Sequence, residues 1–128
     1  MSKPDFQIDE TEGPKQTRAW VLHPDIKNDN DRRDPVPSLA EAVALAEALP
    51  NLEVVGADIV PLRTVNAGQL FGKGKIEELR VFLHDNEVEL VLVDGPVTPV
   101  QQRNLEKAWS VKLLDRTGLI LEIFSDRA

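Results

Sequence analysis

Apolar and polar residues follow one another along the chain in short blocks that predict regular secondary structure. Four blocks are brief and either rich in β-branched residues or uniformly apolar, as buried strands are. They span residues 18–23, 53–62, 90–93 and 111–114. Between them, apolar residues recur at the spacing of an amphipathic helix. These helical segments span residues 38–49, 75–86 and 98–109.

The order of these elements predicts the fold class. Strand and helix take turns from the first strand to the fourth, which indicates an α/β domain of the type βαβαβαβ. We expect a parallel four-stranded sheet with helices on its faces, because parallel strands are joined by crossover helices. In such a sheet all strands end at one carboxyl edge, and ligands bind there.

The helix starts can be assigned from hydrogen-bonding side chains. Ser38 with Glu41, and Thr98 with Gln101, have the spacing of a capping box, in which side chain and backbone at the helix start satisfy one another. The segment 24–37 is rich in proline and charge. We expect a long mobile loop there, followed by a helix that begins at Ser38.

The last residues, 118–128, again carry large apolar side chains at helical spacing. Ile120, Ile123 and Phe124 define one face, and we expect the start of a C-terminal helix. No later element of this chain pairs with that face. These three residues are therefore candidates for packing against another domain, and we expect the chain to be one piece of a larger protein.

Composition narrows the class of protein. The 128-residue chain contains no cysteine, which excludes disulfides and thiolate zinc sites. We expect a disordered tail over 1–16 and one folded domain over 17–128. No apolar run reaches transmembrane length and no signal peptide opens the chain, so we expect a cytoplasmic protein without membrane insertion. The net charge of −7 disfavours nucleic acid as a partner, yet residues 59–76 carry three cations and no acid.

Within that cationic stretch, Gly72-Lys73-Gly74-Lys75 precedes the second predicted helix. A Walker A loop reads G-x-x-x-x-G-K-[ST]. Here one residue too few separates Gly68 from Gly72, and glycine follows Lys73 in place of the hydroxyl ligand for Mg²⁺. We therefore expect no GTP hydrolysis by this chain. A flexible loop with two ammonium groups at a helix N-terminus remains, and both a surface turn and a phosphate-contacting loop fit it.

Two carboxylates, Asp94 and Asp115, end predicted strands at the carboxyl edge. Paired carboxylates can hold Mg²⁺, but a turn and a helix start are the simpler interpretation of these two. Polar side chains of the third predicted helix, among them Arg103, fit either phosphate contacts or a solvated face. The two histidines, His23 and His84, lie far apart in sequence, and we interpret both as structural.

Three blocks of the sequence resemble the N-terminal domain of the HflX family of ribosome-associated GTPases. They read GQLFGKGKIEEL, ELVLVDGPVTPVQQRNLEK and VKLLDRTGLILEIFSDRA. The resemblance extends from about residue 17 to the end of the chain. It implies that a helical arm and a GTPase domain follow in the full-length protein. GTP and Mg²⁺ would then belong to that GTPase domain, and we expect no cofactor in this chain.

The resemblance also implies a function. It implies binding to the large ribosomal subunit through ribosomal RNA, help in dissociating stalled or idle ribosomes under stress, and restraint of the protein's own GTPase domain. An ATP-linked activity is also ascribed to N-terminal regions of the family, so nucleotide binding by the segment 72–75 remains an alternative. By charge and edge position, our candidates for RNA or phosphate contact are Arg63, Gly72, Lys73, Gly74, Lys75, Arg103 and Arg116.

Overall fold

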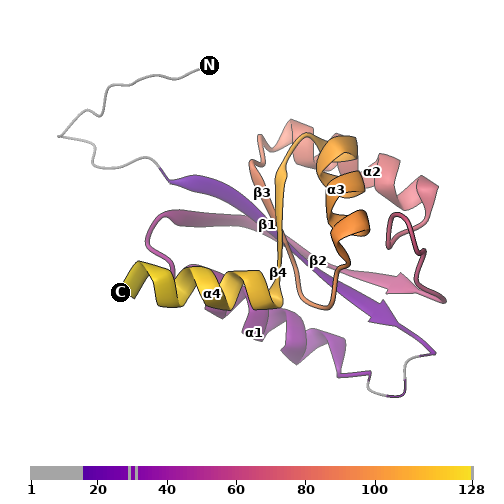
Figure 1. Ribbon diagram of the computed structural model, residues 1–128, viewed down its shortest axis with the longest axis horizontal. Helices are drawn as coiled ribbons and strands as arrows, with labels where there is room; N and C mark the ends of the chain where they lie inside the picture. Colours follow the sequence, from indigo (N-terminus) through magenta and orange to yellow (C-terminus); the bar gives the residue numbers. More distant parts are fainter. Residues whose placement is uncertain (1–15, 29, 31, 128) are drawn as a thin grey trace.

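The computed structural model describes residues 16–127 except 29 and 31, with the side chains of 124–127 outside the description. The described residues form four strands and four helices. In chain order these are β1 (Thr17–Ile26), α1 (Pro35–Glu47), β2 (Leu52–Leu62), α2 (Lys73–Asp85), β3 (Leu90–Val93), α3 (Pro99–Trp109), β4 (Lys112–Asp115) and α4 (Arg116–Arg127). All strand pairs are parallel, and the sheet order is β2-β1-β3-β4. The predicted fold class is confirmed (Figure 1).

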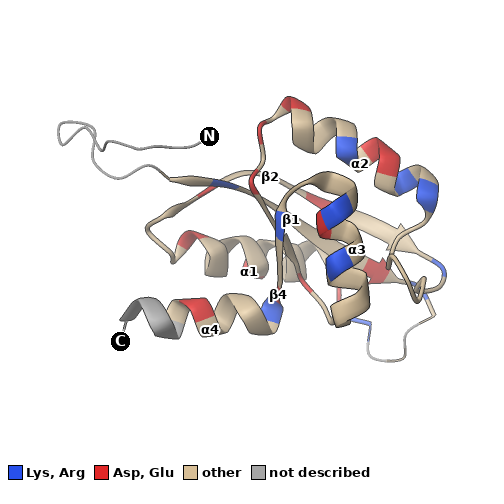
Figure 2. Ribbon diagram, turned by 45° about the horizontal axis from the view of Figure 1, so that its top comes forward, with Lys and Arg blue, Asp and Glu red and all other residues tan. Residues whose placement is uncertain are grey.

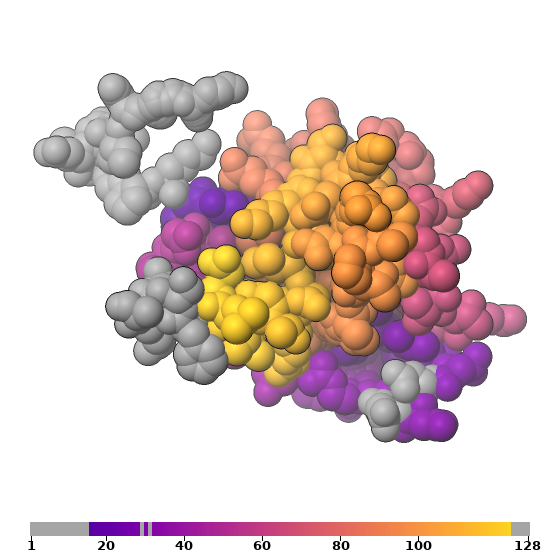
Figure 3. Space-filling model, viewed as in Figure 1, coloured from indigo at the N-terminus to yellow at the C-terminus, as the bar shows by residue number. Residues whose placement is uncertain are grey.

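Helices cover both faces of the sheet. Helices α2 and α3 lie on one face, and α1 and α4 lie on the other (Figure 1). Along β1, Leu22 packs into the core beneath α2 and α3, whereas its neighbour Val21 packs beneath α1 and α4. This alternation is the period of a strand, and it explains why β1 and β3 are apolar at successive positions. In the space-filling view, side chains of the last third of the chain form one continuous surface (Figure 3).

The start of α3 agrees with the sequence prediction, but the start of α1 does not. At α3 the capping box of Thr98 and Gln101 is present in full. Helix α1 begins at Pro35, with Asp34 as N-cap. The Asp34 carboxylate accepts a hydrogen bond from the Val36 amide at 3.4 Å. Proline suits the first helical position because its φ is preset and its missing N–H is not needed there, so the helix starts three residues before Ser38.

The segment 24–37 is not the long loop that we expected. Strand β1 continues to Ile26, paired with Leu62 of β2. Its pairing with β3 ends at Leu22, whose carbonyl accepts the Asp94 amide at 2.8 Å. Pro24 lies two residues later and faces the same side, where no strand needs its missing N–H. Proline is therefore compatible with the strand, and the connection to α1 is correspondingly short.

Helix α4 confirms the predicted C-terminal helix and begins directly after β4. Leu119 is 3% exposed in the core beneath α1, and Ile123 packs partly against the same core. Ile120 is half-buried, whereas Leu121 is 62% exposed. The side chain of Phe124 and the expected tail up to residue 15 lie outside the described residues. Over the described part of the chain, no helix is both long and apolar enough to cross a membrane.

Candidate functional site

The strand order defines a switch point between β1 and β3. The chain leaves β1 towards β2 on one side and later returns past it to β3 on the other. Open α/β sheets bind ligands in the crevice that such a reversal leaves at the carboxyl edge. A cavity of about 550 Å³ opens there, between the end of β1 and the segment after β3.

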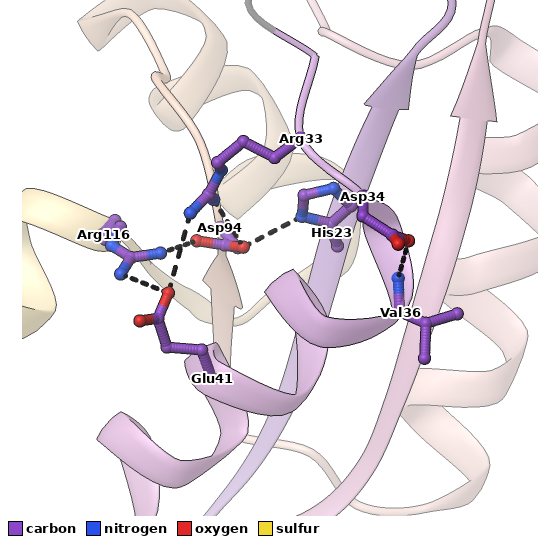
Figure 4. Close-up of polar contacts among 7 residues, drawn as sticks. All are labelled: His23, Arg33, Asp34, Val36, Glu41, Asp94 and Arg116. Atoms are coloured by element: carbon purple, nitrogen blue, oxygen red, sulfur yellow. Dashed lines mark hydrogen bonds and ion pairs between the residues drawn. The ribbon is translucent and has the colours of Figure 1, made fainter.

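One wall of this cavity is built around Asp94, the residue after β3, which is 4% exposed. His23 Nδ1 lies 2.9 Å from its Oδ2 atom, and Arg33 Nη2 lies 3.0 Å from the same oxygen. Arg116 Nη1 donates to Oδ1 at 2.8 Å. Figure 4 shows these side chains converging on the carboxylate from β1, α4 and the segment before α1. Three partners from distant parts of the sequence thus hold one buried charge.

Arg116 extends this cluster to helix α1. Its Nη2 atom donates to Glu41 Oε1 at 2.9 Å (Figure 4). The hydrogen bond to Glu41, followed by the one to Asp94, raises the pKa of the Arg116 guanidinium above its ordinary value. The side chain of Arg116 is 28% exposed and both of its terminal nitrogens are engaged. Arg116, which we predicted as an RNA contact, therefore ties the start of α4 to the sheet edge.

A second buried carboxylate, Asp25, lies near the end of β1 and is 3% exposed. Arg32 binds it in a bidentate manner, with Nε 2.6 Å from Oδ1 and Nη2 3.0 Å from Oδ2. Lys27 Nζ donates to Oδ2 at 3.0 Å. The hydrogen bonds from Arg32, and then from Lys27, outweigh the effect of burial and hold the pKa of Asp25 well below its usual range. Asp25 is therefore charged over the whole physiological range.

The two carboxylates considered for Mg²⁺ have protein partners. Val93 and Asp115 are paired neighbours in the sheet, so Asp94 and Asp115 do end adjacent strands as expected. The carboxylate of Asp94 is hydrogen-bonded to two guanidinium groups and a histidine. Asp115 Oδ1 accepts the Gly118 amide at 2.7 Å in the first turn of α4. No group of three or more potential metal ligands occurs among the described residues.

The glycine–lysine segment lies at the other end of the same edge. Gly72 is the N-cap of α2 and provides no side-chain hydrogen bond. Lys73 is exposed, and Lys75 Nζ is 3.2 Å from Glu78 Oε2 on the helix surface. Figure 2 shows the cationic first turn of α2 followed by acidic positions. A Cβ added at Gly72 or Gly74 would meet nothing within 4 Å, so packing does not require glycine at either position.

We predicted a flexible loop here, but the residues that lead into this segment are buried and held by hydrogen bonds. Leu70 and Phe71 are 2% and 0% exposed, and Leu70 has a φ of 67°. The Asn66 carbonyl accepts Gln101 Nε2 at 2.8 Å, and the Gly68 carbonyl accepts Asn104 Nδ2 at 2.8 Å. The amides of α3 therefore anchor the loop. For these two amides this contact differs from both of the interpretations that we weighed, whereas Arg103 and Lys107 are exposed on α3, as on a solvated face.

The remaining predicted cations are distributed over two elements. Arg63 follows β2 directly and is exposed, and Arg103 is exposed on α3. Arg63 and the segment 72–75 thus both follow β2 and precede or begin α2, whereas Arg116 begins α4. Sequence reasoning missed four polar residues that line the cavity. They are His23, Asp25, Arg32 and Arg33, which we had assigned to a structural role or to a mobile loop.

Comparison with known proteins decides the family. The model described as "GTP-binding GTPase N-terminal" matches residues 37–125. The chain belongs to this family. GTPase HflX of Magnetococcus marinus is 38% identical over 96 residues, which cover 75% of this chain and 22% of that protein. GTPase HflX of Chlamydia pneumoniae is 37% identical over 116 residues, covering 90% of this chain and 24% of that protein.

The domain is thus an HflX-type N-terminal domain, as the sequence resemblance implied, and the chain spans less than a quarter of these relatives. A GTP-binding protein from Sulfolobus solfataricus, solved in complex with GDP, has the same fold. Its TM-score is 0.58 at 20% identity, with 86% of this chain and 30% of that chain covered. The SsGBP and GDP complex gives a TM-score of 0.62 at 22% identity, covering 88% and 30%.

Proposed function

We propose that this domain is the ribosome-contacting and regulatory part of an HflX-like GTPase. In this proposal it contacts ribosomal RNA of the large subunit and helps the full-length protein dissociate stalled or idle ribosomes. In the same proposal, GTP and Mg²⁺ act in a GTPase domain of the full-length protein. The observation that carries the proposal is the exposed segment 72–75 at the carboxyl edge, where cations and uncapped backbone amides lie together.

The chemistry of this segment suits a phosphate backbone. Within the described residues, no side chain caps the first turn of α2, so its amides are available to an anion. Lys73 and Lys75 oppose the helix dipole at this position, so they do not serve helix stability. The open space around Gly72 and Gly74 permits a partner's backbone to approach closely. Exposed Arg63 extends the cationic surface.

The net charge of −7 shapes how such binding would behave. Long-range attraction to RNA is absent, and contact depends on a local cationic surface that acts over a Debye length of about 8 Å at physiological salt. Binding by this domain alone is therefore weak and strongly salt-dependent. Linked contacts from the rest of the full-length protein supply the remaining affinity.

Co-sedimentation with isolated large and small ribosomal subunits tests the proposal. We expect selective pelleting with the large subunit at low salt, and loss of pelleting in Lys73→Ala/Lys75→Ala. A matched control is Lys107→Ala/Lys112→Ala, which removes the same charge at the end of α3 and the start of β4, at the opposite edge of the sheet. Equal pelleting of both double variants would remove the segment 72–75 from the account.

Regulation of the GTPase domain is a second function that a specific observation favours. Helix α4 presents Leu121 at 62% exposure beside half-buried Ile120, a surface suited to another domain. In the full-length protein, Leu121→Ser should change the rate of GTP hydrolysis without ribosomes while leaving the melting temperature of this domain unchanged. An unchanged rate would limit α4 to a structural connection.

Nucleotide binding at the segment 72–75 is the weaker alternative. It would require a metal ion near Asp94 or Asp115, and both carboxylates already bind protein groups. A titration with ATP up to millimolar concentration, monitored by backbone amide shifts, distinguishes nucleotide binding from RNA binding at this segment. Saturable shifts of Gly72 and Gly74 would favour a nucleotide over RNA.

A further inference from the structure

A buried nitrogen that lines the switch-point cavity has no hydrogen-bond partner among the described residues. His23 is 5% exposed, and its Nδ1 atom lies 2.9 Å from Asp94 Oδ2. A carboxylate only accepts hydrogen bonds, so Nδ1 carries a proton, and Nε2 is the ring nitrogen left for another partner. No described residue bonds to Nε2, and His23 lines the cavity. A buried polar nitrogen of this kind is satisfied by a ligand or by water.

The walls of the cavity are apolar on several sides. Ile26, Leu70 and Val97 line it together with Pro24 and Pro96. Val65, at 44% exposure, lies among the lining residues with its side chain accessible from solvent. The volume of the cavity, about 550 Å³, lies within the range of small-molecule sites, which is about 300–1,000 Å³. The cavity thus has room for a small molecule that is largely apolar on its faces.

Two arginines complete the lining. The side chains of Arg32 and Arg33 are 41% and 45% exposed, and each is bound to a buried carboxylate. These hydrogen bonds to Asp25 and Asp94 fix the orientation of the guanidinium planes. Fixed guanidinium planes beside apolar walls offer stacking surfaces for an aromatic ring.

We propose that this cavity receives one unstacked nucleobase. The ring lies between the apolar walls and the guanidinium planes, and a polar group of its edge forms a hydrogen bond with His23 Nε2. The inference rests on the proposed contact with RNA, where single-stranded bases are bound by stacking and by hydrogen bonds to their edges. The same chemistry fits a base within RNA and a base of a free nucleotide.

Titration of the ¹⁵N-labelled chain distinguishes these sources. The probes are the four ribonucleosides, their 5′-monophosphates and single-stranded hexaribonucleotides. We expect saturable amide shifts at Ile26, Gly95 and Val97, together with a shift of the His23 Nε2 resonance. Tighter binding of hexaribonucleotides than of mononucleotides would assign the base to RNA, and equal binding would assign it to free nucleotide. Both results support the nucleobase site.

Two variants test the geometry. His23→Asn keeps an amide donor near the place of Nδ1 for Asp94 but has no counterpart of Nε2. We expect about ten-fold weaker binding, the effect of one hydrogen bond of about 1.4 kcal/mol. Gly95→Val fills the cavity from a position where a Cβ meets nothing closer than 3.9 Å, so the fold should tolerate it. Lys107→Ala, on the far part of α3, is the control and should bind normally.

Absence of saturable shifts at the cavity for all probes at millimolar concentration would overturn the inference, as would shifts confined to the segment 72–75. These outcomes differ from failure of the proposed function. If nucleosides shift the cavity residues but the chain does not pellet with ribosomes, the nucleobase site stands and the ribosome contact falls. Pelleting without shifts at Ile26, Gly95 and Val97 gives the reverse conclusion.

Discussion

Two regions of the carboxyl edge use their charges in opposite ways. Around the ends of β1 and β3, the cations of Arg32, Arg33 and Arg116 are each bound to a carboxylate of the same domain. At the start of α2, Lys73 has no recorded ion pair within the described part of the chain, and Lys75 has one surface partner. We call the first region the closed network, because its cations are paired with buried carboxylates, and the second the open region, because its lysines have at most a surface partner.

This difference between the two regions shows how structural charges can be separated from charges that are available to a partner. Both regions are rich in cations, so residue type alone does not distinguish them. Burial and pairing distinguish the two regions. The carboxylates of the closed network are 3% and 4% exposed, whereas Lys73 is exposed beside glycines that packing does not require. Removal of a buried carboxylate in the first region should therefore lower stability, whereas removal of the lysines in the second region should leave stability unchanged and weaken binding.

Removal of Asp94 should have the largest effect. Asp94→Ala leaves His23, Arg33 and Arg116 without their common acceptor, and we expect the free energy of unfolding to fall by roughly 3 kcal/mol. Urea unfolding measures it. The control Asp85→Ala, at an exposed position of α2, should change stability by less than about 0.5 kcal/mol. Equal effects of the two would show that the buried network does not stabilise the fold.

The Asp25 site gives a pH dependence with a defined sign. Because its pKa is lowered in the folded state, Asp25 stabilises the fold above the unfolded carboxyl pKa of about 3.9, and this contribution is lost as the pH falls through the lower folded pKa. Arg32→Ala removes the largest cause and should raise the pKa of Asp25. Carboxyl ¹³C titration measures it.

The control for this titration is Arg80→Ala. Arg80 lowers the pKa of Glu77 on the surface of α2, so its removal should move the titration of Glu77 and leave Asp25 unchanged. An Asp25 pKa that is the same in Arg32→Ala and in the unaltered chain would contradict the bidentate pairing.

The fold was more predictable than the site, for a physical reason. Hydrophobic periodicity is local in sequence, and it located all four strands and α4. The capping box at Thr98 is equally local and was confirmed. The error at Ser38 arose because two capping signals compete there, and Asp34 with Pro35 prevails. The prolines and charges of 24–37 are strong turn signals, and for that reason we ended the first strand at residue 23, although β1 continues to Ile26.

The site depends on contacts that no local pattern contains. His23 and Asp94 are 71 residues apart, and they meet only because β1 and β3 are neighbours in the sheet. The sequence predicts parallel strands but not their order, so it does not identify the switch point. The segment 72–75, in contrast, is contiguous in sequence, and its glycines and lysines alone were enough to make it a candidate.

Gly74→Ala tests whether the open region is built for contact. Gly74 lies in the first turn of α2 with free space around its Cα, so alanine should stabilise the domain by about 0.5–1 kcal/mol. If a phosphate backbone approaches closely here, the same variant should pellet less with the large subunit. Thermal unfolding and co-sedimentation measure the two effects. Higher stability with unchanged pelleting would argue against close approach.

The smallest effect on stability should come from the lysines themselves. Lys73→Ala/Lys75→Ala removes one exposed pair with Glu78 and two charges that oppose the helix dipole. We expect the free energy of unfolding to change by less than about 0.5 kcal/mol. Urea unfolding provides the comparison with Asp94→Ala. A large loss of stability would mean that the lysines belong to the fold and are not available to a partner.

The most direct test of the central claim is the salt dependence of binding to the large ribosomal subunit. The apparent binding constant would be measured over a series of salt concentrations for the unaltered chain, Lys73→Ala/Lys75→Ala and Lys107→Ala/Lys112→Ala. If Lys73 and Lys75 each contact a phosphate, the first double variant should bind more weakly and its log–log salt slope should be shallower by about two. The second double variant should keep the slope of the unaltered chain. Identical slopes for all three proteins would contradict the assignment of segment 72–75 to RNA.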